Sequence, residues 1–170
     1  MIVFGSPTEF AIEVALEPDP SPRFMGNEPL GRIRTWIGGQ PFDTWEEPSC
    51  LFSALADELL EKGASSYTAW HPSLEHKSPV ERFQVLDNLI YNPEYADRVP
   101  STLDIAPFLT NTVECFDGVK AFALTPSDGF IQLLICDQAN KFASVLVDKN
   151  LLRRMAVGLT DWIRSQRRDA

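Results

Sequence analysis

The chain has 170 residues, of which 44% are hydrophobic and 23% are charged, and its formal net charge is −9. These values are typical of a globular protein and exclude wholesale disorder and a fibrous architecture. The acidic balance argues against a nucleic-acid-binding surface as the main function, because phosphate contacts need clustered Lys and Arg. It permits a basic partner, although acidity is also the routine way in which a cytoplasmic protein stays soluble.

The chain is expected to fold as one domain over residues 1–170, a length that can bury a core without disulfides. Its cysteines, Cys50, Cys115 and Cys136, are odd in number and lack CxxC spacing, so a disulfide framework is not expected. The N-terminus has no basic n-region, and no apolar run approaches the length of a membrane helix. We therefore expect a cytoplasmic protein without membrane association.

The first part of the chain predicts strands around a glycine turn. In residues 8–17, "TEFAIEVALE", apolar residues recur with the period of a half-buried strand. The proline-rich residues 17–29 should form a surface loop. Residues 30–37, "LGRIRTWI", predict a second strand with isoleucines on one face and arginines on the other. Gly38 and Gly39 can both adopt positive φ, which predicts a two-residue turn into "QPF".

Two amphipathic helices are predicted next. Residues 48–63 have a proline in the first turn and a glycine at the end. Residues 78–91 open with Ser78 and Glu81 at capping-box spacing, and residues 64–77 should be a loop. Apolar stripes at helical spacing should face the core. They comprise Leu51, Phe52, Leu55, Leu59 and Leu60 in the first helix, and Val80, Phe83, Leu86, Leu89 and Ile90 in the second.

From residue 112 the chain predicts an antiparallel meander. "TVECFDGVKAFAL" places two β-prone runs around Asp117-Gly118, a strong hairpin signal. Residues 130–137 and 142–148 predict further strands, and residues 148–170 predict a last helix capped by Asp148. Helices do not alternate regularly with strands, which favours an α+β fold: a mainly antiparallel sheet of about five to seven strands with two or three helices packed on it.

Motifs for cofactors, metals or nucleophilic catalysis are weak, and we expect none of these. Gly38-Gly39 matches neither of the phosphate-binding glycine patterns. His71 and His76 are five residues apart around a proline and are expected to be loop residues rather than metal ligands. Cys50, near a helix start, could have a lowered pKa, but no histidine stands in a recognisable motif with it. The cysteines are therefore expected to be structural.

Carboxylate pairs could act as acid and base if burial separated their pKa values, yet nothing in the sequence indicates such burial. The pair Glu46-Glu47 lies in a loop, and the polar helix face is expected to be solvated. That face carries Asp57, Glu58 and Glu61. No catalytic residue is predicted. A hydrolase that uses Asp43 with the Glu46-Glu47 pair is kept as a hypothesis, after the binding functions that are described below.

Aromatic residues in loops suggest binding instead. Trp45 lies among carboxylates and Trp70 lies beside His71, and tryptophan is enriched in interface hot spots, while acidic rims speed the capture of basic partners. The alternative is that Trp45 packs back on the helix that follows it. Trp36 and Trp162, inside periodic elements, are expected in the core. The predicted partner-binding residues are Asp43, Trp45, Glu46, Glu47 and Trp70.

Several segments together resemble the immunity protein 42 family of bacterial polymorphic toxin systems. They are "FGSPTEFAIEV", "LGRIRTWIGGQPF" with its sequel "DTWEEPSCL", and "FDGVKAFAL". The resemblance covers most of the chain in order and length, and the loops at residues 17–29 and 64–79 are where the sequence departs from the family pattern. It implies no catalytic residues.

The resemblance implies a cytoplasmic protein that binds and neutralises a cognate secreted toxin by stoichiometric occlusion, without catalysis or cofactor. The acidity would suit a basic toxin such as a nuclease. A secretion chaperone or adaptor, which would share the acidity and the helix-sheet fold, is the alternative.

Overall fold

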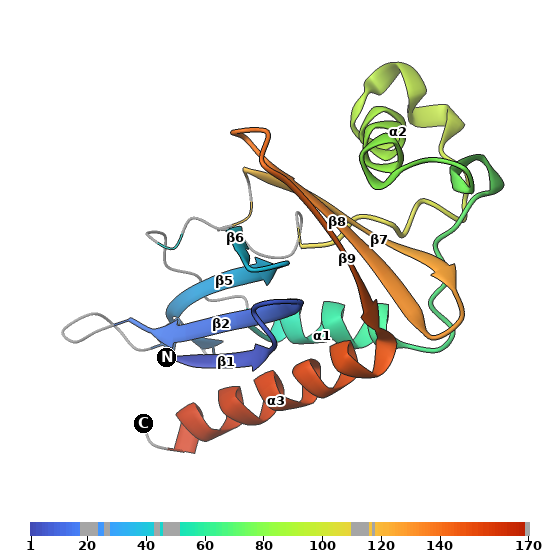
Figure 1. The fold of residues 1–170 in the computed structure, drawn as a ribbon. Coiled ribbons are helices and arrows are strands. Elements are labelled where there is room, and N and C mark those ends of the chain that lie inside the picture. The colour runs from blue at the N-terminus through green and yellow to red at the C-terminus, as the bar shows by residue number, and fades with distance from the viewer. Residues whose placement is uncertain are drawn as a thin grey trace.

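The computed structural model describes residues 1–17, 24–25, 28–42, 45, 52–109, 116 and 118–168. Within these residues, seven antiparallel strands form two sheets, two further strands of two residues each pair with one another, and three α-helices are present (Figure 1). The predicted α+β class is thus confirmed, although the strands are divided between two sheets instead of forming one.

The first sheet has the order β1-β2-β5-β6. Its strands are β1 (Ile2–Gly5), β2 (Phe10–Leu16), β5 (Gly31–Ile37) and β6 (Gln40–Phe42). Between β5 and β6, Gly38 and Gly39 have φ angles of 57° and 80°, as a type I′ turn requires. Ile37 consequently pairs with Gln40, and the predicted hairpin is confirmed.

Strand β2 is buried on both faces, which its alternating pattern does not predict. Its apolar face lies in the core as expected, but Ala11 and Glu13 on the other face are also only 0% and 4% exposed. Trp36 of β5 lies opposite Ala11 and its indole N–H reaches Glu13, so the neighbouring strand covers this face.

Residues 17–29, predicted as a surface loop, contain a two-residue ladder. It pairs β3 (Phe24–Met25) with β4 (Glu28–Pro29). A strand this short needs few donors, so Pro29 is tolerated in it despite lacking an N–H. Residues 18–23 and 26–27 lie outside the described part of the chain.

The second sheet is the predicted meander, in the order β7-β8-β9. Its strands are β7 (Val119–Ser127), β8 (Phe130–Asp137) and β9 (Phe142–Asp148). The first arm of the hairpin predicted around Asp117-Gly118 lies outside the described residues except for Phe116, which is in a 3-10 turn. Residues 106–108 occupy that edge of β7 at Phe122: the Phe108 N–H donates to the Ala121 carbonyl, and the Ala123 N–H donates to the Ala106 carbonyl.

The helices are α1 (Phe52–Gly63), α2 (Pro79–Tyr91) and α3 (Lys149–Arg168), with two 3-10 helices at Pro72–Leu74 and Pro93–Arg98. The capping box of α2 is confirmed, since Ser78 and Glu81 hydrogen-bond each other's backbone N–H. Asp148 Oδ1 accepts the Asn150 N–H at 2.6 Å, as predicted for the cap of α3. The first turn predicted for residues 48–51 lies outside the described residues.

Buried apolar side chains from both sheets and all three helices form one cluster. Helices α1 and α3 lie side by side beneath the first sheet, and α2 packs against the second sheet (Figure 1). Two predicted stripe positions are wrong, because Leu60 is 51% exposed and Val80 is 45% exposed. In each helix, the predicted apolar stripe is wider than the helix face that packs against the rest of the protein.

Polar groups inside the molecule connect the predicted loop at residues 64–77 to β7 and to the start of α3. The Tyr67 hydroxyl donates to the Ala123 carbonyl at 2.7 Å, and Lys149 Nζ donates to the Tyr67 carbonyl at 2.6 Å. Burial first, and then Glu61 and Glu58, raise the pKa of Tyr67, so its hydroxyl stays a donor. This loop is therefore anchored to the interior at Tyr67.

Candidate functional site

Strand β5 directs Arg32, Arg34 and Trp36 away from the core, as its alternating burial shows. Trp45, which follows β6, contacts the same strand. The guanidinium carbon of Arg34 lies 4.4 Å from the Trp45 ring centroid and 5.6 Å from that of Trp36. Stacking of this kind is worth about 0.5–1 kcal/mol at exposed sites and more when desolvated. Arg34 is thus held by two indole rings.

Two glutamates fix this arrangement from β2. Glu13 lies opposite Arg34 in the register, accepts the Trp36 indole N–H at 2.8 Å and lies 3.7 Å from Arg34 Nη1. Beyond the end of β2, Glu17 Oε1 accepts from Arg32 Nε at 2.6 Å. Arg32 Nη1 also donates to the Trp45 carbonyl at 3.0 Å. We call the whole set the tryptophan–arginine face: Glu13, Glu17, Arg32, Arg34, Trp36 and Trp45.

The tryptophan–arginine face is half-exposed and already ordered. The side chains of Arg32 and Arg34 are 27% and 26% exposed, and both tryptophans are half-buried. Tryptophan and arginine dominate interface hot spots, and a surface that is ordered before binding loses less entropy when a partner arrives. This arrangement is suited to contact with another protein.

The structure places the predicted binding residue Trp45 on β5, through the Arg34 stack and the Arg32 hydrogen bond. Asp43, Glu46 and Glu47 lie outside the described residues. The core position expected for Trp36 is wrong, because this half-buried residue lies on the outward face of β5. Sequence reasoning also missed the link from Glu13 to the arginines, which the antiparallel pairing of the two strands could have indicated.

Trp70 belongs to a different region of the molecule. Its ring centroid lies 4.9 Å from the guanidinium carbon of Arg82 on α2. Arg82 donates to the carbonyls of Leu74 and Glu75 at 2.9 and 3.2 Å, and to Gln132 Oε1 on β8 at 2.7 Å. Trp70 itself packs partly buried against the core. In the described part of the chain, Trp70 and Trp45 therefore have separate surroundings.

The histidines are in the segment between α1 and α2, as predicted. His71 caps the short helix at Pro72–Leu74, with Nδ1 accepting the Ser73 N–H at 3.3 Å. His76 follows it and is exposed. Among the residues that the structure describes, no group of three or more His, Cys, Asp or Glu side chains could hold a metal ion.

One carboxylate of the α1 polar face has a structural role. Asp57 and Glu61 are exposed as expected, but Glu58 is half-buried and its Oε1 accepts the Leu109 N–H at 3.0 Å. Leu109 has a φ of 66°, an uncommon conformation for a leucine. The expectation of a solvated Glu58 is therefore wrong, because the chain that follows the 3-10 helix at Pro93–Arg98 returns to α1.

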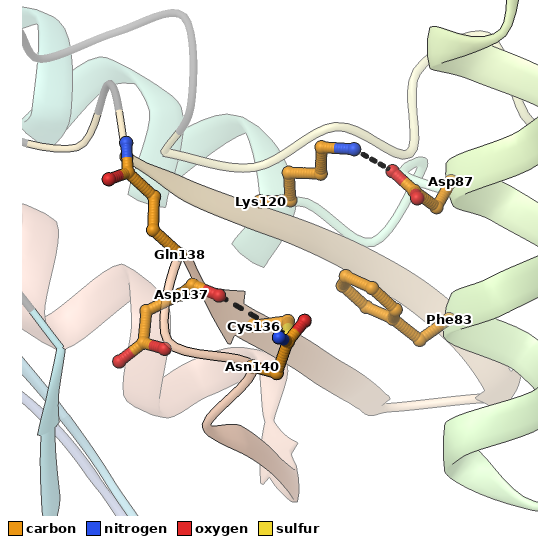
Figure 2. A pocket seen from close by; sticks show the side chains of 8 residues that line it. Phe83, Asp87, Lys120, Cys136, Asp137, Gln138 and Asn140 are labelled. Carbon is orange, nitrogen blue, oxygen red and sulfur yellow. Dashed lines mark hydrogen bonds and ion pairs between the residues drawn. The ribbon is translucent and has the colours of Figure 1, made fainter.

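A cleft of about 340 Å³ lies between α2 and the end of the second sheet (Figure 2). On one side Lys120 Nζ pairs with Asp87, and on the other the Cys136 thiol donates to the Asp137 carbonyl at 3.7 Å. Burial first, and then Asp137 and Asp87, raise the pKa of Cys136. The thiol therefore stays protonated and is a poor nucleophile, which fits the expected structural role. Cys50 and Cys115 lie outside the described residues.

No helix in the described part of the chain is long and apolar enough to cross a membrane. The tryptophan–arginine face is a connected set of half-exposed aromatic and charged side chains, whereas in the cleft Lys120 pairs with Asp87, and Asp137 accepts backbone N–H groups. The molecule is thus an α+β protein whose tryptophan–arginine face has residue types that are enriched in interface hot spots.

The sequence matches the model of the immunity protein 42 family over residues 1–162, and the chain belongs to this family. It is an immunity protein of bacterial polymorphic toxin systems. The fold is similar to that in the crystal structure of CdiI from Burkholderia dolosa AUO158, with a TM-score of 0.65 and 16% identity. That similarity covers 94% of this chain and 99% of the CdiI chain. A comparison with curated protein sequences gives no match.

Proposed function

We propose that the protein binds one cognate toxin domain stoichiometrically and blocks it by occlusion, without catalysis and without a cofactor. The observation that carries this proposal is the family match, which extends over residues 1–162. The chain acts as a single domain over residues 1–170, in the cytoplasm of the cell that it protects.

The tryptophan–arginine face is the proposed centre of the toxin interface. Trp45 supplies a large half-buried ring that is already fixed by Arg34 and Arg32. Asp43, Glu46 and Glu47 adjoin Trp45 in the sequence and form the proposed acidic rim. Trp70 is the remaining proposed contact, and it can offer only the part of its ring that the core and Arg82 leave exposed. Its share of the binding energy is therefore the smaller one.

A basic toxin domain, such as a nuclease, is the partner that suits the charge of this chain. The net charge of −9 favours association with a cation-rich surface and repels nucleic acid. The protein would then compete with the nucleic acid for the toxin without binding nucleic acid itself.

The direct test is co-expression with the toxin domain encoded by the neighbouring gene. Restored growth, together with recovery of both proteins in one purified complex, is the expected result. Growth arrest in cells that contain soluble immunity protein would contradict the proposal.

The toxin activity of the purified complex separates inhibition from the alternative role as a secretion chaperone or adaptor. An inhibitor leaves the bound toxin inactive, whereas a chaperone would leave a folded toxin domain active.

A further inference from the structure

Helices α1 and α3 run antiparallel and leave a groove between them. The C-terminal Gly63 of α1 lies against Lys149 and Arg153 at the start of α3, while Ser53 and Arg167 line one hollow at the other end. The middle of the groove encloses about 230 Å³. Ala56 of α1 and Ala156 of α3 line it, and their small apolar side chains leave the groove open and make its floor apolar. The groove is lined by Ala56, Asp57, Leu60, Ala156, Val157 and Thr160, among others.

Two large apolar side chains stand on opposite rims of this groove. Leu60 on α1 is 51% exposed and Val157 on α3 is 56% exposed. Complete burial of such a side chain is favourable by about 1.5–3 kcal/mol. Leu60 also continues the apolar stripe of α1 beyond the part that the fold covers. The helix pair therefore presents an apolar strip that the described part of the chain leaves exposed.

The charges beside this strip have opposite signs on the two helices. Asp57 and Glu61 are exposed on α1, and Arg154 and Arg164 are exposed on α3. Arg164 has a partner on its own helix, Asp161, at 3.6 Å, but both side chains are more than 60% exposed and such a pair is weak. An acidic helix beside a basic helix, with apolar residues between them, is complementary to its own copy after a two-fold rotation.

We propose that a second copy of this chain docks on the α1–α3 groove, forming a symmetric antiparallel four-helix interface. A two-fold axis parallel to the helix pair places α1 of each copy over α3 of the other. Leu60 then contacts Val157 of the second copy, and Asp57 faces Arg164 of the second copy. The tryptophan–arginine face lies on the first sheet and is not part of this interface, so the pairing does not depend on toxin binding.

The test is the molar mass of the purified protein without toxin, measured by light scattering over a concentration series under reducing conditions, which exclude intermolecular disulfides. The wild type is expected to approach twice the chain mass of 19.1 kDa as concentration rises. Val157→Asp and Leu60→Asp are expected to remain at the chain mass. Val80→Asp is the matched control, since Val80 is a similarly exposed apolar residue on α2, and it should behave as the wild type. Circular dichroism identifies any variant that fails to fold.

A charge exchange tests the arrangement. Asp57→Arg and Arg164→Asp are each expected to weaken the dimer, and the double variant should recover it because opposite charges face each other again. A wild type that stays at the chain mass at every concentration overturns the proposal. So does a dimer that survives both Val157→Asp and Leu60→Asp. If the wild type is monomeric and Val157→Asp lowers toxin affinity, the groove belongs to the toxin interface and the second copy is excluded.

Discussion

Two tryptophan–arginine stacks occupy different regions of this molecule, and their surroundings give them different roles. Arg34 stacks on Trp45 and Arg82 stacks on Trp70, at 4.4 and 4.9 Å. Arg82 donates hydrogen bonds to two carbonyls that precede α2 and to Gln132 of β8, so this arginine connects separate segments. The described contacts of Arg34 are with side chains on the outer surface of the first sheet and with Trp45. The same pair of residue types therefore builds the fold in one place and a surface in the other.

The largest expected effect is on the Arg82–Trp70 stack, which we call the interior stack; we call the Arg34–Trp45 stack the surface stack. Arg82→Ala removes three charge-assisted hydrogen bonds to two segments and leaves Oε1 of the buried Gln132 without the Arg82 donor. We expect the free energy of unfolding, measured by urea denaturation, to fall by about 2–4 kcal/mol. Arg98→Ala is the matched control, because Arg98 stacks on Tyr95 at the surface and should lose at most about 0.5 kcal/mol. Equal losses in the two variants would remove the structural distinction between the stacks.

The surface stack should instead affect binding. Trp45→Ala is expected to weaken toxin affinity about 30-fold, equivalent to about 2 kcal/mol, because it removes the central ring of the proposed interface. The free energy of unfolding should change by less than about 1 kcal/mol, since Trp45 is half-buried outside the core. Calorimetric titration with the toxin measures the first quantity and urea denaturation the second.

Trp70→Ala is the matched variant at the other stack. It should lower stability more than affinity, because Trp70 packs against the core. If Trp70→Ala weakened toxin binding more than Trp45→Ala did, the centre of the toxin interface would lie beside α2, and the proposed position on the first sheet would be wrong.

Much of the fold follows from local sequence patterns. The glycine pair at Gly38-Gly39, the capping box of Ser78 with Glu81, and the Asp148 cap each depend on a few neighbouring residues, and all are confirmed. These signals are local because the backbone hydrogen bonds that they satisfy lie within a few residues.

The positions that sequence reasoning missed depend on contacts between distant segments. A helical wheel places Glu58 on the polar face of α1, yet its side chain accepts the Leu109 N–H from 51 residues away. Arg82 reaches Gln132 across 50 residues, and no periodicity indicates that contact. In the candidate site, the residue type and sequence neighbours of Trp45 are enough to predict a binding role. Its stack with Arg34 cannot be predicted in this way, because it depends on where the chain after β6 lies relative to β5.

A smaller effect tests whether stacking or charge matters in the surface stack. Arg34→Lys keeps a cation near Glu13 but loses the planar guanidinium that covers the Trp45 ring. We expect toxin affinity to fall about fivefold, or about 1 kcal/mol, with stability nearly unchanged. Arg98→Lys, the same change at the Tyr95 stack, should leave affinity unaltered. An unchanged affinity for Arg34→Lys would mean that charge alone is recognised.

The smallest expected effect concerns the cap that begins α2, the helix that carries Arg82. Hydrogen bonds from the Ser78 hydroxyl first, and then from its backbone N–H, lower the pKa of Glu81 in the folded protein. The resulting stabilisation is present above the unfolded pKa of about 4.3 and is lost as the pH falls through the lower folded value. Glu81→Gln retains an acceptor but cannot titrate.

Urea denaturation of the wild type and Glu81→Gln at about pH 7 and about pH 3 measures this contribution. The difference in free energy of unfolding between the wild type and Glu81→Gln should become smaller at the acidic pH. Ser78→Ala removes the hydroxyl donor, and in that background the difference should already be smaller at neutral pH. Toxin affinity should be unaffected, because the cap lies beside the interior stack and not on the tryptophan–arginine face. An advantage that stays constant or grows on acidification would mean that the Ser78 hydrogen bonds do not favour the charged form of Glu81. Ionisation of Glu81 would then not stabilise the start of α2, and the interior stack would be stabilised by the Arg82 contacts alone.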